Sequence, residues 1–156
     1  MKIKFICINK TRSGWIRDGM DEYLQRLRRY ITVELKEVEV NNSAKKGKAD
    51  LVLEEAQKVL GCMKAGDHLV LLDEKGKMQD SEAFAQWLNR KFVTIQGDLV
   101  FVVGGAYGFH DVLKEKSVEM ISLSKMTFTH QMVRVVFIEQ VYRAMTILNN
   151  EPYHHS

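Results

Sequence analysis

Five consecutive apolar residues, Leu99-Val100-Phe101-Val102-Val103, run directly into the glycine-rich segment Gly104-Gly105-Ala106-Tyr107-Gly108. An apolar run of this length predicts a strand covered on both faces, as in a parallel sheet flanked by helices. The glycines allow the backbone to turn sharply and to approach a ligand closely. Their spacing matches neither the dinucleotide-binding fingerprint nor the phosphate-binding P-loop, so a nicotinamide or nucleoside triphosphate site is poorly supported.

Similar strands alternate with helical patterns on both sides of this segment. The hydrophobic periodicity predicts strands at 2–9, 31–40, 68–72, 99–103 and 119–122, and helices at 14–30, 49–63, 111–116, 131–149 and from Ser81 onward. Ser13 is a candidate N-cap, 41–48 is a polar basic loop, 73–77 is a turn and 122–130 is a loop. The alternation indicates an α/β fold with a mainly parallel sheet, in one domain spanning residues 1–156.

The segment 131–149 is apolar around almost its whole helical circumference. Such a helix must be buried on all sides, so we expect one side to pack on the sheet and the other to form a homodimer interface. The charged residues within it, Arg134, Glu139 and Arg143, then need partners or a function.

Composition and charge exclude several classes of protein. Hydrophobic residues make up 46% of the chain, and no apolar run approaches the roughly 20 residues of a membrane helix, so no membrane partner is expected. Residues 1–50 hold 12 Lys and Arg against 7 Asp and Glu, which fits either a polyanionic partner or solvated helix faces. Cys7 and Cys62 lack metal-ligand spacing and are expected to be free thiols in a reducing cytoplasm. The adjacent His154 and His155 do not suggest a metal site.

In open parallel sheets, ligands bind beyond the carboxyl ends of the strands. This rule predicts a site formed by Leu72-Asp73, by 104–108 and by the loop 123–128. His68 and His110 are interpreted as structural residues, whereas His130 closes the predicted ligand loop and its role is left open.

Several spaced motifs resemble the RlmH family. They are Leu72-Asp73 with Gly76-Lys77, Val102 to Phe109, Leu123 to Phe128, His130-Gln131-Met132, Arg134, Glu139-Gln140, Tyr142-Arg143-Ala144 and Tyr153-His154. The resemblance covers the whole chain and is most specific in its C-terminal third. It implies methylation of N3 of a pseudouridine in bacterial 23S ribosomal RNA, in the large subunit or the assembled ribosome, with S-adenosyl-L-methionine as methyl donor.

The resemblance also implies the SPOUT methyltransferase fold, whose C-terminal segment forms a trefoil knot, and an obligate homodimer. It assigns methyl-donor binding to eight residues: Leu72, Gly104, Leu123, Ser124, Lys125, Met126, Thr127 and Phe128.

Methylation at N3 requires loss of the imide proton, so a general base or a cation that stabilises the imide anion is needed. The candidates are Arg134, Glu139, Arg143, Tyr153 and His154. Arg134 and the Glu139–Arg143 pair fit a buried structural network equally well. Tyr153 and His154 lie on a polar tail that can reach the other subunit's site. RNA phosphates are expected at Arg26, Arg28, Arg29, Lys45, Lys46 and Lys48.

Two positions depart from the family pattern. His155 stands where a Lys or Arg often follows the Tyr-His pair, and Thr129 stands where a proline often precedes the histidine. The main rival function is a non-catalytic RNA-binding protein of the same fold. A second rival is an α/β enzyme that acts on a small molecule.

Overall fold

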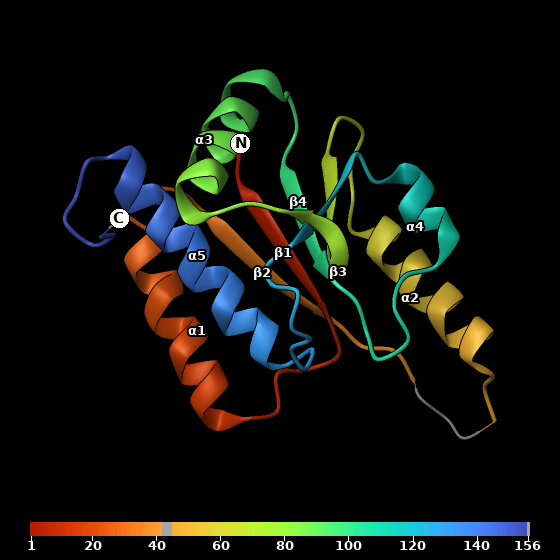
Figure 1. Cartoon of the computed structure of the whole chain (residues 1–156). Helices are drawn as coiled ribbons and strands as arrows, with labels where there is room; N and C mark the ends of the chain where they lie inside the picture. The colour runs from red at the N-terminus through yellow and green to blue at the C-terminus, as the bar shows by residue number, and fades with distance from the viewer. Residues whose placement is uncertain (42–44, 156) are drawn as a thin grey trace.

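The computed structural model describes residues 1–41 and 45–155. Its strands are β1 (Ile3–Ile8), β2 (Val33–Val38), β3 (His68–Met78), β4 (Leu99–Val103) and β5 (Glu119–Ser122). They form one sheet in the order β2-β1-β4-β3-β5, and every neighbouring pair is parallel (Figure 1). The carboxyl ends of all these strands therefore lie at one edge of the sheet.

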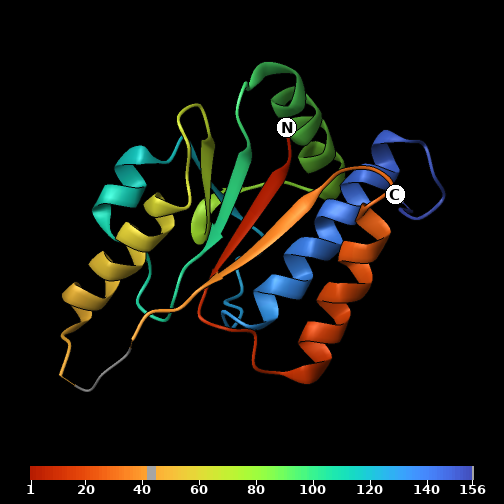
Figure 2. The same ribbon diagram turned by 180° about the vertical axis from the view of Figure 1, so that it is seen from behind.

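Helices cover both faces of the sheet. They are α1 (Gly14–Leu27), α2 (Lys48–Gly61), α3 (Ser81–Thr94), α4 (Asp111–Lys116) and α5 (Met132–Leu148). Figures 1 and 2 show α1, α3 and α5 on one face and α2 and α4 on the other. The predicted α/β class and parallel sheet are confirmed.

The two faces have separate apolar cores because side chains alternate along a strand. In β1, Ile3, Phe5 and Cys7 belong to the core under α1, α3 and α5, whereas Ile6 and Ile8 belong to the core under α2 and α4. All of β1 and β4 is buried, so these two strands form the centre of the sheet.

The predicted turn at 73–77 is wrong. β3 continues to Met78, with a register shift between Leu72 and Lys77, and its last residues pair with Ile121 and Ser122 of β5. Gly76 permits this pairing because a Cβ atom there would lie 2.6 Å from the backbone of Ile121. The Asp73–Gly76 segment therefore bulges outward at the carboxyl edge of the sheet.

The chain itself covers more of α5 than the sequence pattern predicts. α1 and α3 flank α5 on the same face of the sheet. Gly19 of α1 allows close approach, since a Cβ atom there would lie 3.0 Å from Val135 Cγ2. A half-buried strip of α5 remains on the outer side, which includes Met132, Val136, Arg143 and Ile147.

Other details refine the sequence predictions. α1 ends at Leu27 rather than at Tyr30, and Ser13 occupies the N-cap position without a side-chain capping hydrogen bond. Cys7 and Cys62 are free, and burial raises the pKa of the Cys7 thiol to about 12. Within the described residues, no helix is long and apolar enough to cross a membrane. Residues 42–44 of the predicted basic loop lie outside the described residues, and the trefoil knot stays a prediction.

Candidate functional site

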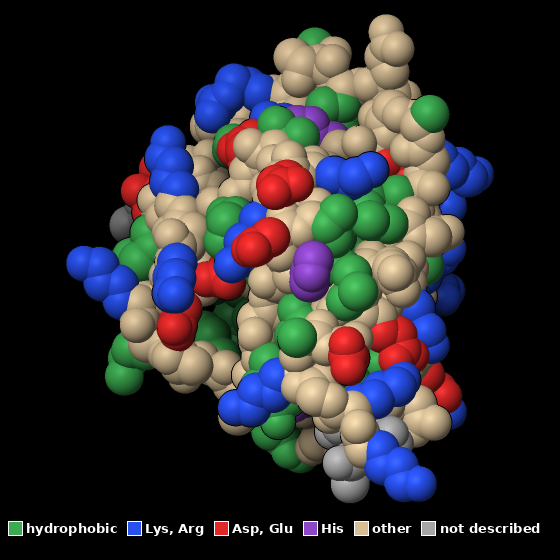
Figure 3. Space-filling model, turned by 90° about the vertical axis from the view of Figure 1, so that its right-hand side faces the viewer, with side chains coloured by type: hydrophobic (Ala, Val, Ile, Leu, Met, Phe, Trp, Pro, Cys, Tyr) green, Lys and Arg blue, Asp and Glu red, His purple; other side chains and the backbone are tan. Residues whose placement is uncertain are grey.

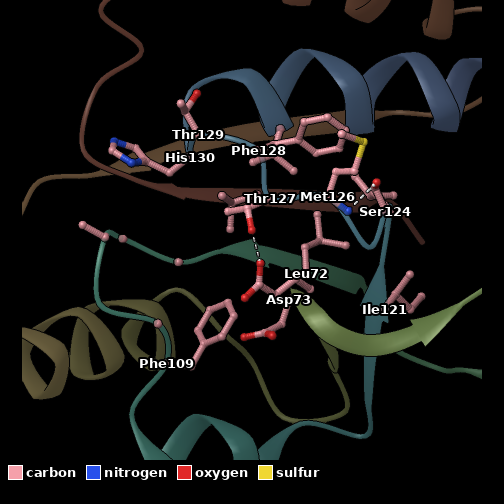
Figure 4. A pocket seen from close by; sticks show the side chains of 18 residues that line it. Leu72, Asp73, Phe109, Ile121, Ser124, Met126, Thr127, Phe128, Thr129 and His130 are labelled. Atoms are coloured by element: carbon pink, nitrogen blue, oxygen red, sulfur yellow. Dashed lines mark hydrogen bonds between the residues drawn. The ribbon is translucent and has the colours of Figure 1, made fainter.

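A cavity of about 440 Å³ lies at the carboxyl edge of the sheet, where the ends of β3, β4 and β5 meet (Figure 4). Its wall contains large apolar side chains, including Val103, Phe109, Ile121 and Val133. Asp73 and Glu74, from the bulge of β3, supply carboxylates. We call this space the cofactor cavity. Its size is typical of a site for a small organic ligand.

The glycine-rich segment after β4 forms one wall of the cofactor cavity. Gly105 and Gly108 pair across a tight turn, and Gly108 has a φ of +77°, which glycine adopts without strain. A Cβ atom on Gly104 would lie 3.1 Å from the ring of Phe109, which also lines the cavity. The turn therefore brings backbone groups, rather than side chains, to the cavity surface.

The opposite wall is the loop between β5 and α5. Ser124 fixes its start, because its carbonyl accepts from Ser122 Oγ at 2.8 Å and its own Oγ accepts from the Met126 N–H at 2.9 Å. Thr127 Oγ1 donates to Glu74 Oε2 at 2.5 Å across the mouth (Figure 4). Met126 is 78% exposed at the rim.

The structure brings seven of the eight residues predicted to bind the methyl donor into the lining of this cavity. Lys125 is the exception, since it belongs to the loop but does not line the cavity. Asp73 also lines it, as the strand-end rule predicted, and so does His130, whose role was left open, whereas Phe109 and Ile121 were missed. Phe109 directly follows the glycine-rich segment that the strand-end rule identified, whereas nothing local to Ile121 distinguishes it from other core residues.

Arg134 does not line the cofactor cavity. It is fully buried, and its guanidinium donates to the carbonyls of Ile8, Asn9 and His130 at 2.6 to 3.0 Å and to Thr11 Oγ1 at 2.9 Å. These contacts tie the loop after β1 to the start of α5. The geometry favours the structural alternative for Arg134 over a catalytic one.

The other four catalytic candidates lie together beside the middle and second half of α5. Arg143 Nη2 donates to Glu139 Oε1 at 2.6 Å, and Tyr153 Oη donates to the same oxygen at 3.1 Å. The guanidinium of Arg143 lies over the Tyr153 ring and 3.3 Å from His154 Nδ1. We call Glu139, Arg143, Tyr153 and His154 the tail cluster. Burial, and then the hydrogen bond with Tyr23, raise the pKa of Tyr153 above its ordinary value.

In one chain the cofactor cavity lies at the start of α5, where Val133 lines it, whereas the tail cluster lies farther along the helix. Glu139 and Arg143 follow Val133 by six and ten residues, which is about 9 and 15 Å along α5 at the usual helical rise. No methyl group can be transferred over such distances. The tail cluster of one chain therefore cannot act in its own cofactor cavity in this conformation.

The predicted RNA-binding residues also separate into two groups. Arg26, Arg28 and Arg29 lie at the end of α1 near the tail, where Arg26 pairs with Glu22 and Arg29 pairs with Glu151. Lys45, Lys46 and Lys48 precede or open α2, at the carboxyl edge of the sheet. Figure 3 shows cations mixed with acidic side chains over the face that carries α2 and α4. Among the described residues of this face, no single-sign patch would by itself mark an RNA surface.

The histidines outside the tail have different surroundings. His110 Nδ1 accepts from the Val112 N–H at 3.1 Å and caps α4, which confirms its structural interpretation. His68 is half-buried at the start of β3, at the opposite edge from the cofactor cavity. In the described part of the chain, no group of three or more His, Cys, Asp or Glu residues is arranged to hold a metal ion.

The chain is similar to known methyltransferases over its full length. A family model described as "Predicted SPOUT methyltransferase" matches residues 1–154. Proteins named "Ribosomal RNA large subunit methyltransferase H" from Parabacteroides distasonis and a Geobacter species are 49% and 42% identical to it, over 99% of this chain and 99% of each relative.

Solved structures are similar in fold. A tRNA (m1G37) methyltransferase from Aquifex aeolicus matches with a TM-score of 0.60 and 14% identity, over 100% of this chain and 76% of that chain. A probable methylase family protein from Haemophilus influenzae matches with a TM-score of 0.56 and 13% identity, over 99% of this chain and 70% of that chain.

Proposed function

Because the chain belongs to the SPOUT methyltransferase family, we propose that it transfers a methyl group from S-adenosyl-L-methionine to N3 of a pseudouridine in 23S ribosomal RNA. The observation that carries this proposal is the 49% identity, over nearly the whole of both chains, to a relative named as a large-subunit ribosomal RNA methyltransferase. The motifs that resemble the RlmH family supply the acceptor position. The substrate is the large subunit or the assembled ribosome, which places the enzyme in the cytoplasm.

The cofactor cavity suits the proposed methyl donor. S-adenosyl-L-methionine, when bound, supplies an electrophilic methyl group on a sulfonium. The apolar wall of Leu72, Phe109 and Ile121 suits an adenine ring, and the carboxylate of Asp73 or Glu74 can accept hydrogen bonds from ribose hydroxyls or an amino group. The backbone at Gly104 and Gly105 offers hydrogen-bonding groups without side chains that would occupy the space.

The tail cluster supplies the acid–base chemistry in this proposal. The raised pKa of Tyr153 keeps its phenol protonated at neutral pH, so His154 is the better acceptor for the imide proton. The guanidinium of Arg143, held by Glu139, can stabilise the imide anion that remains. Since the tail cluster is remote from its own cofactor cavity, we propose that it acts in the cavity of a second copy, in a homodimer.

The decisive test is methyl transfer to ribosomes from a strain that lacks this activity. We expect one methyl group per 23S RNA, on N3 of a single pseudouridine, measured by isotope incorporation and by mass spectrometry of RNA fragments. Calorimetry with S-adenosyl-L-methionine separates the enzyme from the rival RNA-binding protein. Ribosome binding without binding of the methyl donor would establish that rival instead.

A further inference from the structure

A second cavity, of about 390 Å³, adjoins the cofactor cavity. The two cavities share Gly105, Ala106 and His130 in their linings. Figure 4 shows His130 at the end of the cofactor cavity away from Ser124 and Met126. Gly105 and Ala106 of the glycine turn therefore border both spaces. Binding of the methyl donor in the cofactor cavity does not account for the second space.

The lining of the second cavity combines an aromatic ring with cations. Tyr107 is 50% exposed at the tip of the turn, and Lys48 Nζ lies 5.0 Å from its ring centroid. Arg12 is exposed, and its guanidinium forms no ion pair with a carboxylate among the described residues. Lys10 pairs with Glu39 at 2.9 Å, but both side chains are about two-thirds exposed, so a phosphate can replace Glu39 at little cost.

The loop after β1, residues 9–12, carries Lys10 and Arg12 and is hydrogen-bonded to the start of α5. Gln131 Oε1 accepts from the Arg12 N–H at 2.9 Å, and Gln131 Nε2 donates to the Lys10 carbonyl at 3.1 Å. Asn9, at a φ of +62°, turns the chain as β1 ends, and its carbonyl accepts from the buried Arg134. The backbone of residues 9–12 is thus fixed before any ligand arrives, which lowers the entropic cost of binding.

Glu55 forms the back of the second cavity. Its buried carboxyl accepts a hydrogen bond from the Gly105 N–H, and a Cβ atom on Gly105 would lie 2.6 Å from Glu55 Oε1. Burial raises the pKa of Glu55 above its ordinary value. Glu55 therefore braces the turn that carries Tyr107, whereas Arg12 and Lys10 are exposed.

An exposed aromatic ring beside two cations is the combination that binds a single-stranded nucleotide, with the base stacked and its phosphate neutralised. The nucleotide that receives the methyl group must contact the methyl donor directly, so the proposed function places it at the cofactor cavity rather than in the second cavity. A nucleotide next to the methylated one has no such constraint.

We propose that the second cavity holds the RNA nucleotide adjacent to the methylated one, with its base on Tyr107 and its phosphate at Arg12 and Lys10. This inference rests on the proposed function, because it takes the substrate to be ribosomal RNA. It assigns recognition of the flanking RNA to this edge of the sheet rather than to the arginines at the end of α1.

The test compares Arg12→Ala and Tyr107→Leu with a matched control, Arg90→Ala, which removes an exposed arginine of α3. We expect Arg12→Ala to raise the KM for large subunits about tenfold and to lower the salt dependence of binding by about one counterion. Tyr107→Leu should raise the KM by a similar factor, and Tyr107→Phe should restore it because stacking needs only the ring. Affinity for S-adenosyl-L-methionine and kcat at saturating subunits should remain as in the wild type.

Co-sedimentation of each variant with large subunits distinguishes this inference from the proposed function. If the wild type binds subunits without methylating them, the proposed function fails, and weaker binding by Arg12→Ala and Tyr107→Leu still supports the nucleotide site. The inference is overturned if both variants bind and methylate like Arg90→Ala. It is also overturned if Tyr107→Leu weakens binding of S-adenosyl-L-methionine as strongly as binding of RNA.

Discussion

At the scale of single residues, the sheet contains one buried ammonium group that all three central strands depend on. Lys4 in β1 lies 2.8 Å from Asp67 Oδ2 and 3.3 Å from Asp98 Oδ2, just before the starts of β3 and β4. The side chains of Lys4 and Asp67 are only 2% and 3% exposed. A buried charge without its partner is strongly unfavourable, so neither group can be removed alone without cost.

We therefore expect Lys4→Met to lower the free energy of unfolding by about 3–5 kcal/mol, because Asp67 keeps a buried charge without its cation. The control is Lys2→Met, which removes a partly exposed ion pair with Glu34 and should cost about 1 kcal/mol or less. Urea unfolding followed by circular dichroism measures both. Equal losses for the two variants would contradict the role assigned to Lys4.

Lowering the pH should remove the stabilisation that the Lys4–Asp67 ion pair provides. Burial alone would raise the pKa of Asp67, but hydrogen bonds from Lys4 and from the backbone N–H groups of Lys64 and Asp98 lower it below its ordinary value. Such a carboxylate stabilises the fold above its unfolded pKa, about 3.9, and the contribution is lost as the pH falls through the folded pKa. Urea unfolding at a series of pH values should show the wild type losing stability below about pH 4, and Lys4→Met losing less. If the free energies of unfolding of the wild type and of Lys4→Met change with pH in parallel, this prediction is contradicted.

Gly104 provides a test of the cofactor cavity at the same scale. Replacing Gly104 by Val places branched carbons against the ring of Phe109, which must then move into the space between the glycine turn and the loop 123–128. We expect the variant to fold but to lose measurable binding of S-adenosyl-L-methionine in calorimetry. Gly47→Ala is the control, since a Cβ atom there meets nothing within 4 Å. Normal binding by Gly104→Val would place the methyl donor elsewhere.

At the scale of elements, the sequence pattern predicted those strands and helices whose formation depends mainly on neighbouring residues. The run Leu99–Val103 predicted β4 because five apolar residues need two covered faces. The extension of β3 was missed because Asp73 to Lys77 has the composition of a turn, and its pairing depends on how closely β5 approaches Gly76. Periodicity showed that α5 is buried, but it could not show that α1 and α3 supply much of the cover.

The parts of the candidate site that depend on strand direction could be predicted from the sequence, and the parts that depend on distant contacts could not. The strand-end rule located the glycine turn and the loop 123–128, since it depends only on the direction of the strands. Arg134 was ambiguous because two of the carbonyls that accept from it, those of Ile8 and Asn9, lie more than 100 residues away in the chain, which no spacing in the sequence reveals. The folding of the tail could likewise not be predicted from the sequence pattern, because Tyr153 packs on Tyr142 and Tyr23 through tertiary contacts.

The tail is the element whose chemistry can be tested most directly. We expect His154→Ala to lower the rate of methyl transfer by about 100-fold, the scale of a lost acid–base group, and to leave affinity for S-adenosyl-L-methionine unchanged. His155→Ala is the matched control, because His155 is exposed and adjacent. If the two variants have the same activity, the base is not His154.

At the scale of the whole molecule, one chain keeps the cofactor cavity and the proposed acid–base groups apart. The cofactor cavity lies at the carboxyl edge of the sheet and is lined by Val133, whereas Glu139 and Arg143 of the tail cluster lie about 9 and 15 Å farther along α5. Apolar side chains remain exposed toward the cavity end, with Trp15 63% and Met126 78% exposed. A second copy that packs in the opposite direction would cover apolar surface and bring each tail cluster to the other chain's cavity.

Mixed dimers test this arrangement, once light scattering has established a dimeric mass for the wild type. One chain carries His154→Ala, and the other carries Gly104→Val. Each parent homodimer should be nearly inactive, since every site lacks either the base or the methyl donor. If the tail crosses, the intact cavity of the first chain receives the intact His154 of the second, and one of two equivalent sites works at about half the wild-type rate. If the tail acts within its own chain, neither chain holds both groups, and the mixed dimer should be as inactive as its parents. A monomeric mass at micromolar concentration would end the proposal before any mixing, because the tail cluster would then have no cavity within reach.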